Sequence, residues 1–230
     1  MFLRDYDGLT VPECQALPST EPLRSSRRWA IFIIGKTFLG NIGILCYIEH
    51  QKMRILALSD IDDFHWKGGS GSADVLLSCG DIVDQVILEA AEAFSCSTIL
   101  AVKGNHDSNT AFPHPIVDLH LQVYEHNGVT FGGLNGSWKY KPRGHFLYDQ
   151  IEVDKWLASF PPVDVLLSHN SPRGIHDRED EVHYGFEALK DYVLRARPKI
   201  VVHGHQHVDA ETLLGDTRII GVYGHKMIEI

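Results

Sequence analysis

Short apolar runs separated by polar segments dominate the chain from residue 54 to the C-terminus. Runs of strand length occur at Ile55–Leu58, Val75–Leu77, Ile99–Val102, Val163–Leu167 and Ile200–Val202. Apolar runs this short, bounded by turn-forming residues, are typical of buried strands. The sequence therefore predicts five strands in this part of the chain.

Helical periodicity fills several of the gaps between these strands. It predicts helices over Val83–Phe94, Phe186–Arg195 and, more briefly, Val153–Phe160. His126-Asn127-Gly128-Val129 predicts a two-residue turn in a hairpin made by Leu119–Tyr124 and Val129–Phe131. Thr217–Val222 and His225–Ile230 complete the set as two further strands. Strands that alternate with helices, together with hairpins, predict an α/β sandwich with mixed sheets.

The first fifty residues follow a different pattern. Residues 1–28 are polar and irregular and contain three prolines, which predicts a poorly ordered arm. Residues 30–48 carry only one charge and follow three arginines, so they fit a membrane anchor. We favour instead an added pair of strands, Ile31–Ile34 and Ile42–Ile48, with GKTFLGN between them as a hairpin connection. A third interpretation is that the natural chain starts at Met53, where MRILALSD reads like the opening of a domain.

We therefore divide the chain into an N-terminal extension, 1–52, and a main domain, 53–230. No small-residue cleavage site follows the apolar stretch, which argues against a cleaved signal peptide. The four cysteines are widely spaced and form no C-x-x-C pair, which indicates reduced thiols in a cytosol-like compartment. We expect a cytoplasmic protein, with membrane anchoring through residues 30–48 as the alternative.

Each predicted strand is followed by side chains that can bind metal ions. The segments after the five runs read SDID from Ser59, SCGD from Ser78, KGNHD from Lys103, SHN from Ser168 and HGHQH from His203. Open α/β sheets place their sites at the carboxyl ends of strands. One such polar residue would be a solvated strand end or a cap, but five such ends with only oxygen and imidazole ligands predict a metal site.

These segments, as an ordered set, resemble the motifs of the calcineurin-like metallophosphoesterases. The matching features are a first Asp motif, GD-x-x-D, GNH-[DE], a lone His after a strand, and GH-x-H, and they span roughly residues 54–230. The family fold is a pair of mixed β-sheets packed as a sandwich and flanked by helices. The resemblance thus implies the same fold class as the apolar pattern.

The resemblance implies a site for two divalent ions. One ion would be held by Asp60, Asp62, Asp81 and His207; the second would be held by Asp81, Asn105, His169 and His205, with Asp81 as the bridge. In the family, a hydroxide that bridges the ions attacks phosphorus, and His106 would protonate the leaving oxygen or stabilise the phosphoryl oxygens. Asp84 would support the reaction by orienting His106, or it would simply complement the dipole of a helix.

Position 62 departs from the family pattern. The first motif is normally Asp-x-His, and here it is Asp60-Ile61-Asp62. Aspartate is an acceptable ligand for hard divalent ions, so the change predicts oxygen-preferring ions, with Mn²⁺ ahead of Mg²⁺, Fe or Zn²⁺. The alternative is that Asp62 points away and that His65 or a water takes its place.

The leading functional hypothesis is a dinuclear metal-dependent hydrolase of phosphate esters, either a phosphodiesterase, a phosphomonoesterase or both. Arg173 and Asn170, just after His169, are candidates for binding a substrate phosphate. The formal charge of −9 and the lack of a basic stripe predict a small phosphate-ester substrate and no long nucleic acid. The alternative is a catalytically weak or inactive protein of the same fold that acts as a binding scaffold. The sequence indicates no oligomeric state.

Overall fold

The computed structural model of the chain describes residues 29–36, 42–48 and 52–230. The chain divides into two compact units, Met1–Gln51 and Lys52–Ile230. In the first unit, strands β1 (Trp29–Lys36) and β2 (Ile42–Ile48) pair antiparallel. The stretch that fitted either strands or a membrane anchor is therefore β-structure where it is described. Among the described residues, no helix has the length and apolar character needed to cross a membrane.

The second unit is built on two mixed β-sheets. The six-stranded sheet has the order β13 (Ala210–Leu214), β14 (Thr217–Gly221), β12 (Ile200–His203), β11 (Val165–Ser168), β8 (Val129–Leu134), β7 (Val123–His126). The five-stranded sheet has the order β15 (Gly224–Glu229), β3 (Arg54–Ser59), β4 (Val75–Ser78), β5 (Ile99–Ala101), β6 (Val117–Asp118). The central strands of both sheets are parallel, while β13, β7 and β15 pair antiparallel at the edges.

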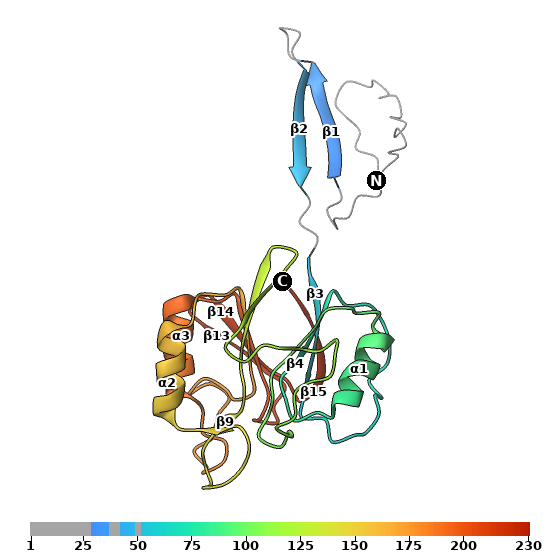
Figure 1. Ribbon diagram of the computed structural model, residues 1–230. Helices are drawn as coiled ribbons and strands as arrows, with labels where there is room; N and C mark the ends of the chain where they lie inside the picture. Colours follow the sequence, from blue (N-terminus) through green and yellow to red (C-terminus); the bar gives the residue numbers. More distant parts are fainter. Residues whose placement is uncertain (1–28, 37–41, 49–51) are drawn as a thin grey trace. The chain divides into compact units, whose positions relative to one another are not determined.

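Helices cover the outer faces of the two sheets (Figure 1). Helix α1 (Asp84–Ala93) packs on the five-stranded sheet, and helices α2 (Gln150–Ser159) and α3 (Glu187–Ala196) pack on the six-stranded sheet. A short parallel pair, β9 (Ser137–Trp138) and β10 (Leu147–Tyr148), lies outside both sheets. The unit is thus an α/β fold with two mixed sheets and flanking helices, which confirms the predicted fold class.

The strand sequences explain why this layering forms. In β3, Ile55 and Ala57 belong to the core between the two sheets, while Leu56 and Leu58 belong to the core under α1. Successive side chains of a strand point to opposite faces, so a strand that is covered on both faces needs apolar residues at every position. All four side chains are fully buried. The continuous apolar runs of the sequence are therefore the central strands of the fold.

Three differences between the observed and the predicted elements have a clear physical reason. Helix α2 starts three residues before the predicted helix, because the Glu152 carboxylate accepts a hydrogen bond from the N–H of Asp149 at 2.9 Å and caps the first turn. The predicted strand Leu119–Tyr124 is wrong over residues 119–122, since only Val123–His126 pairs in the hairpin with β8. Strand β13 was missed because it is a partly exposed edge strand without an apolar run.

Candidate metal centre

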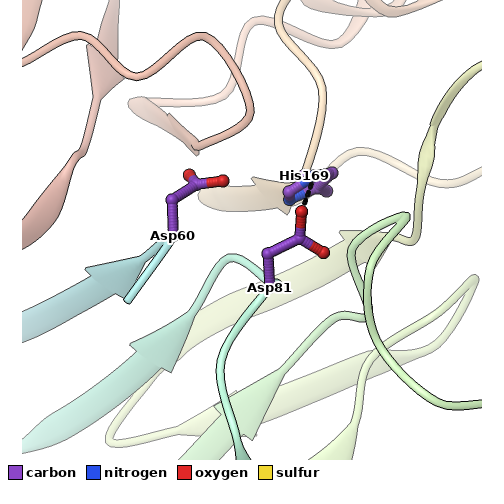
Figure 2. Close-up of side chains that lie close together, drawn as sticks. All are labelled: Asp60, Asp81 and His169. Atoms are coloured by element: carbon purple, nitrogen blue, oxygen red, sulfur yellow. Dashed lines mark ion pairs between the residues drawn. The ribbon is translucent and has the colours of Figure 1, made fainter. Parts of the chain in front are cut away.

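The predicted metal-binding segments lie at the carboxyl ends of central strands in both sheets. Those after β3, β4 and β5 belong to the five-stranded sheet, and those after β11 and β12 belong to the six-stranded sheet. Figure 2 shows that the carboxylates of Asp60 and Asp81 and the ring of His169 face a common space. Three residues that follow different strands are thus brought to one point, although Asp60 and His169 are 109 positions apart in the sequence.

Asp60, Asp81 and His169 form the cluster best suited to hold a cation. One ligand atom from each of the three lies within 4.8 Å of the others. Asp60 was predicted as a ligand of the first ion and His169 as a ligand of the second. Asp81 was predicted to bind both ions. His169 is fully buried and Asp81 is nearly so, with His169 Nε2 lying 3.3 Å from Asp81 Oδ2.

The Asp60 carboxylate is held on one side only. Its Oδ2 accepts hydrogen bonds from Ser59 Oγ at 2.6 Å and from the N–H of His205 at 2.9 Å. Its Oδ1 is buried and has no hydrogen-bond partner among the described residues, although His207 Nε2 lies 3.5 Å away. A buried carboxylate oxygen without a partner costs free energy unless a cation binds it. The residues of this cluster therefore fit a divalent metal ion.

Two glycines make the close approach of these loops feasible. A Cβ atom at Gly204 would lie 1.7 Å from Ser59 Oγ and 2.6 Å from Asp60 Oδ2. A Cβ atom at Gly104 would lie 2.0 Å from Asp81 Oδ1. Side chains at either position would displace a carboxylate of the cluster, so glycine is needed there for space.

Four of the predicted ligands have left-handed backbone conformations. The φ angles of Asp60, Asp81, His205 and His207 are +53°, +55°, +63° and +51°. Such conformations are unfavourable for residues other than glycine and concentrate at functional sites, where the surrounding structure enforces them. At Asp60 and Asp81 these conformations coincide with the shared space that Figure 2 shows.

Asp81 and His169 form a strongly coupled pair. Burial alone would lower the pKa of His169, but the adjacent Asp81 and Asp60 carboxylates raise it to about 9. Burial would raise the pKa of Asp81, yet the pairing with His169 and the N–H of His106, which lies 2.8 Å from Oδ1, lowers it to about 2. Without a metal the imidazolium thus supplies the positive charge that two buried carboxylates require.

Hydrogen bonds fix which ring nitrogen each histidine can offer to a metal. His169 Nδ1 lies 2.8 Å from the carbonyl oxygen of Cys79 and must donate to it, which leaves Nε2 for a metal. His205 Nε2 donates to the carbonyl oxygen of Val182 at 3.0 Å, which leaves Nδ1. Burial lowers the pKa of His205 to about 3, so this ring is neutral, as a ligand must be.

The remaining predicted ligands surround the cluster. Asn105 Oδ1 lies 3.0 Å from His169 Nε2, and the ring of His205 lies 5.0 Å from that of His169. His207 is half-exposed beside Asp60 and stacks on Tyr223 at 5.0 Å between ring centroids. The structure therefore brings Asn105, His205 and His207 to the same place as the three cluster residues.

Asp62 lies apart from the cluster. Its side chain is exposed and lines a neighbouring cavity. His65, the alternative occupant of this position, instead contacts Glu89 Oε1 at 3.1 Å and does not line the cavity. A ligand role for Asp62 remains a prediction, whereas a ligand role for His65 is not supported by its position.

A cavity of about 550 Å³ opens beside Asp60 and Asp81. His106 is exposed and lines this cavity, while its backbone N–H is the group that binds Asp81. The imidazole of His106 is therefore free to contact a ligand in the cavity, directly next to the candidate metal centre.

Asp84 lines the cavity but does not orient His106 through a hydrogen bond between described side chains. It accepts a hydrogen bond from Lys103 Nζ at 3.3 Å. Lys103 is buried, with only 5% of its side chain exposed, and its ammonium group also lies 3.6 Å from the ring centroid of Phe112. Asp84 thus neutralises a buried cation, a role that the sequence did not indicate.

Arg173 and Asn170 bind protein groups outside the cavity. The Arg173 guanidinium binds Asp177 and Glu179, each at 2.6 Å, and stacks on Tyr184. Asn170 is fully buried and donates to the carbonyl oxygen of Tyr184 at 3.0 Å. Neither residue lines the cavity, so their predicted contact with a substrate phosphate gains no support from their positions.

Two contributors to the site were missed by the sequence interpretation. The Asp107 carboxylate accepts hydrogen bonds from the N–H groups of Asp81, Ile82 and Gly104, at 2.9, 3.2 and 2.7 Å, and so joins the loops after β4 and β5. Tyr140 Oη accepts a hydrogen bond from Asn105 Nδ2 at 3.3 Å, which turns Asn105 Oδ1 towards His169. The acidic last position of GNH-[DE] was a signal for Asp107, whereas nothing in the sequence linked Tyr140 to Asn105.

The fold and the cluster together define a two-sheet α/β protein with a candidate divalent-metal site at its strand ends. The chain belongs to the calcineurin-like phosphoesterase family, whose model matches residues 53–209. No curated protein matches the chain.

Solved structures share the fold at low sequence identity. TT1561 of Thermus thermophilus is 14% identical, with a TM-score of 0.51 over 76% of this chain and 90% of that one. A Staphylococcus aureus protein solved with α-ketoglutarate is 9% identical, with a TM-score of 0.53 over 78% of this chain and 51% of its own. A third structure is 16% identical, with a TM-score of 0.56 over 78% and 95%. At these identities the likeness extends to the fold alone.

Proposed function

We propose that this protein is a hydrolase of phosphate esters that depends on divalent metal ions. One observation carries the proposal: the Asp60–Asp81–His169 cluster, in which Asp60 Oδ1 is buried without a hydrogen-bond partner among the described residues, adjoins a cavity of about 550 Å³. Membership of the calcineurin-like phosphoesterase family supports the reaction class. Mn²⁺ is the ion we expect first, since carboxylate and amide oxygens make up much of the ligand set.

We assign two ions to the residues around the cluster. Asp60, Asp81 and His207 would hold the first ion, with Asp62 completing it if its exposed side chain turns inward. Asp81, Asn105, His169 and His205 would hold the second ion. Divalent ions bound there supply an activated water nucleophile and stabilise the charge that develops on the phosphoryl oxygens.

The chain's own groups would position the substrate and manage protons. His106 faces the cavity, so its imidazole is placed to donate a proton to the leaving oxygen or to hydrogen-bond a phosphoryl oxygen. The N–H of His106 holds Asp81, and Asp107 holds the loops that carry both residues. The catalytic group and the bridging ligand are thereby fixed to each other through the backbone.

The test is hydrolysis of bis-p-nitrophenyl phosphate and p-nitrophenyl phosphate by metal-stripped full-length protein, before and after reloading with Mn²⁺, Mg²⁺ or Zn²⁺. We expect reloading to restore turnover, Asn105→Ala to lower it through weaker metal binding, and His106→Ala to lower kcat with metal binding retained. A protein that binds metal but hydrolyses neither ester with any of the three ions would contradict the proposal and favour a binding scaffold.

A further inference from the structure

The cavity beside the metal centre has an apolar wall that the proposed reaction does not require. Phe64 and Val83 line it, and 74% of Phe64 and 45% of Val83 is exposed. Large apolar side chains are usually buried, and an exposed group of them within a cavity indicates a contact surface for a ligand.

The wall is built into the fold. Phe64 follows β3 and Val83 follows β4, and a parallel bridge between Ile61 and Ile82 joins these two segments through the backbone. Ile82 is buried in the core under α1, and Ile61 packs against that core. Phe64 and Val83 are therefore close in sequence to residues that are anchored on the core, and they line the same cavity as Asp60 and Asp81.

The rest of the lining is strongly acidic. It contains Asp60, Asp62, Asp81, Asp84 and Asp107, and Lys103 is the one lysine or arginine among the described lining residues. With neutral histidines the lining carries a formal charge of −4, which two divalent ions would only just neutralise. Asp84 is paired with Lys103, whereas Asp62 is exposed and has no ion-pair partner among the described residues. A ligand with anionic groups beyond its phosphate would therefore be repelled by Asp62 at the cavity edge.

We infer that the substrate is a phosphate ester whose alcohol carries an aromatic or other apolar group close to phosphorus, and no second anionic group. The phosphate lies at the Asp60–Asp81 end of the cavity and the apolar group lies against Phe64 and Val83. This inference rests on the proposed function, because it takes the phosphate position from the metal centre.

Binding of uncleavable phosphinates tests the inference without relying on turnover. Diphenylphosphinate and dimethylphosphinate have the same single charge and differ only in their apolar groups. Bis(4-carboxyphenyl)phosphinate keeps the two rings and adds two carboxylates. Each is titrated by calorimetry into the full-length protein loaded with Mn²⁺. We expect diphenylphosphinate to bind about tenfold more tightly than dimethylphosphinate, and the dicarboxylate to bind at least about threefold more weakly than diphenylphosphinate.

A matched pair of variants assigns the preference to the wall. Phe64→Ser should reduce the preference for diphenylphosphinate about fivefold and leave dimethylphosphinate binding unchanged. Leu213→Ser is the control, because Leu213 on β13 is similarly exposed, at 68%, and does not line the cavity. The control should keep the wild-type preference.

The outcomes separate the inference from the proposed function. Equal binding of the diphenyl and dimethyl compounds, or an unchanged preference in Phe64→Ser, would overturn the inference even if the protein hydrolyses phosphate esters. Tighter binding of the dicarboxylate would overturn the charge argument. Absence of both phosphinate binding and metal-dependent hydrolysis would overturn the inference together with the proposed function.

Discussion

Gly204→Ala should damage the metal centre and the fold together. The added Cβ would lie 1.7 Å from Ser59 Oγ and 2.6 Å from Asp60 Oδ2, well inside van der Waals contact. Ser59 is fully buried at the end of β3, and Asp60 Oδ2 is held by hydrogen bonds from Ser59 Oγ and the N–H of His205, so neither group can move aside without losing contacts. Gly204 has an ordinary φ, so the effect is one of space and not of backbone strain.

Two terms set the magnitude. Overpacking of a well-packed interior costs about 1–3 kcal/mol. Displacing Ser59 also breaks its 2.6 Å hydrogen bond to the Asp60 carboxylate, and a hydrogen bond to a charged group contributes about 1.5–3 kcal/mol. We therefore expect a loss of about 3–5 kcal/mol, a large fraction of the stability of a typical domain.

Urea unfolding of metal-free protein measures this loss. Gly215→Ala is the control: it has φ +61° and, among the described residues, no non-neighbouring atom within 4 Å of the added Cβ, so it should cost only about 1 kcal/mol of backbone strain. In a Ser59→Gly background the main clash is gone, and Gly204→Ala should then cost less than about 2 kcal/mol. The steric explanation would be refuted if Gly204→Ala were no worse than Gly215→Ala, or cost the same in both backgrounds.

Three further predictions concern groups around the cluster. Asp107→Asn should destabilise the protein by about 2–4 kcal/mol in urea unfolding, because an amide has one acceptor oxygen where the carboxylate serves three N–H groups through two; a loss under about 1 kcal/mol would show that the loops hold without it. Because the pKa of metal-free His169 is raised to about 9 and a ligand must be unprotonated, Mn²⁺ binding at pH 7 should release about one proton and tighten as the pH rises towards 9; calorimetry in two buffers of different ionisation enthalpy measures this, and proton-neutral binding would contradict it. Tyr140→Phe should weaken Mn²⁺ binding roughly threefold to tenfold by freeing the Asn105 amide to rotate, with little change in stability; unchanged affinity would show that Tyr140 does not position Asn105.

Much of the fold could be predicted because the central strands are buried on both faces. Leu56 and Leu58 face one core and Ile55 and Ala57 the other, so the strand appears in the sequence as an unbroken apolar run. Strand β13 has no such signature, because Glu211, Thr212 and Leu213 are exposed at the edge of its sheet. Edge strands are defined by their neighbours more than by their own residues.

In the candidate site, too, the residues that could be predicted are those whose place is set by the strands themselves. Residues such as Asp60 and Asp81 could be found because a sheet gathers the carboxyl ends of its parallel strands. The pairing of Lys103 with Asp84 could not, because either side chain has several reachable partners and only the packed structure selects one. Arg173 illustrates the same limit: its place in the sequence next to His169 suggested a phosphate contact, and in the structure it binds Asp177 and Glu179.

The central claim is that the Asp60–Asp81–His169 cluster is a metal centre. Its most direct test is the stoichiometry and affinity of Mn²⁺ binding to the full-length protein by calorimetry, compared with Asp81→Asn and Asp63→Asn. Asp63 is the matched control, because it is a nearby aspartate that pairs with Lys67 and does not line the cavity.

We predict two Mn²⁺ ions per chain, a loss of more than roughly 100-fold in affinity for Asp81→Asn, and wild-type binding for Asp63→Asn. Wild-type Mn²⁺ binding by Asp81→Asn would contradict the account, because no ion could then depend on the residue assigned to bridge both.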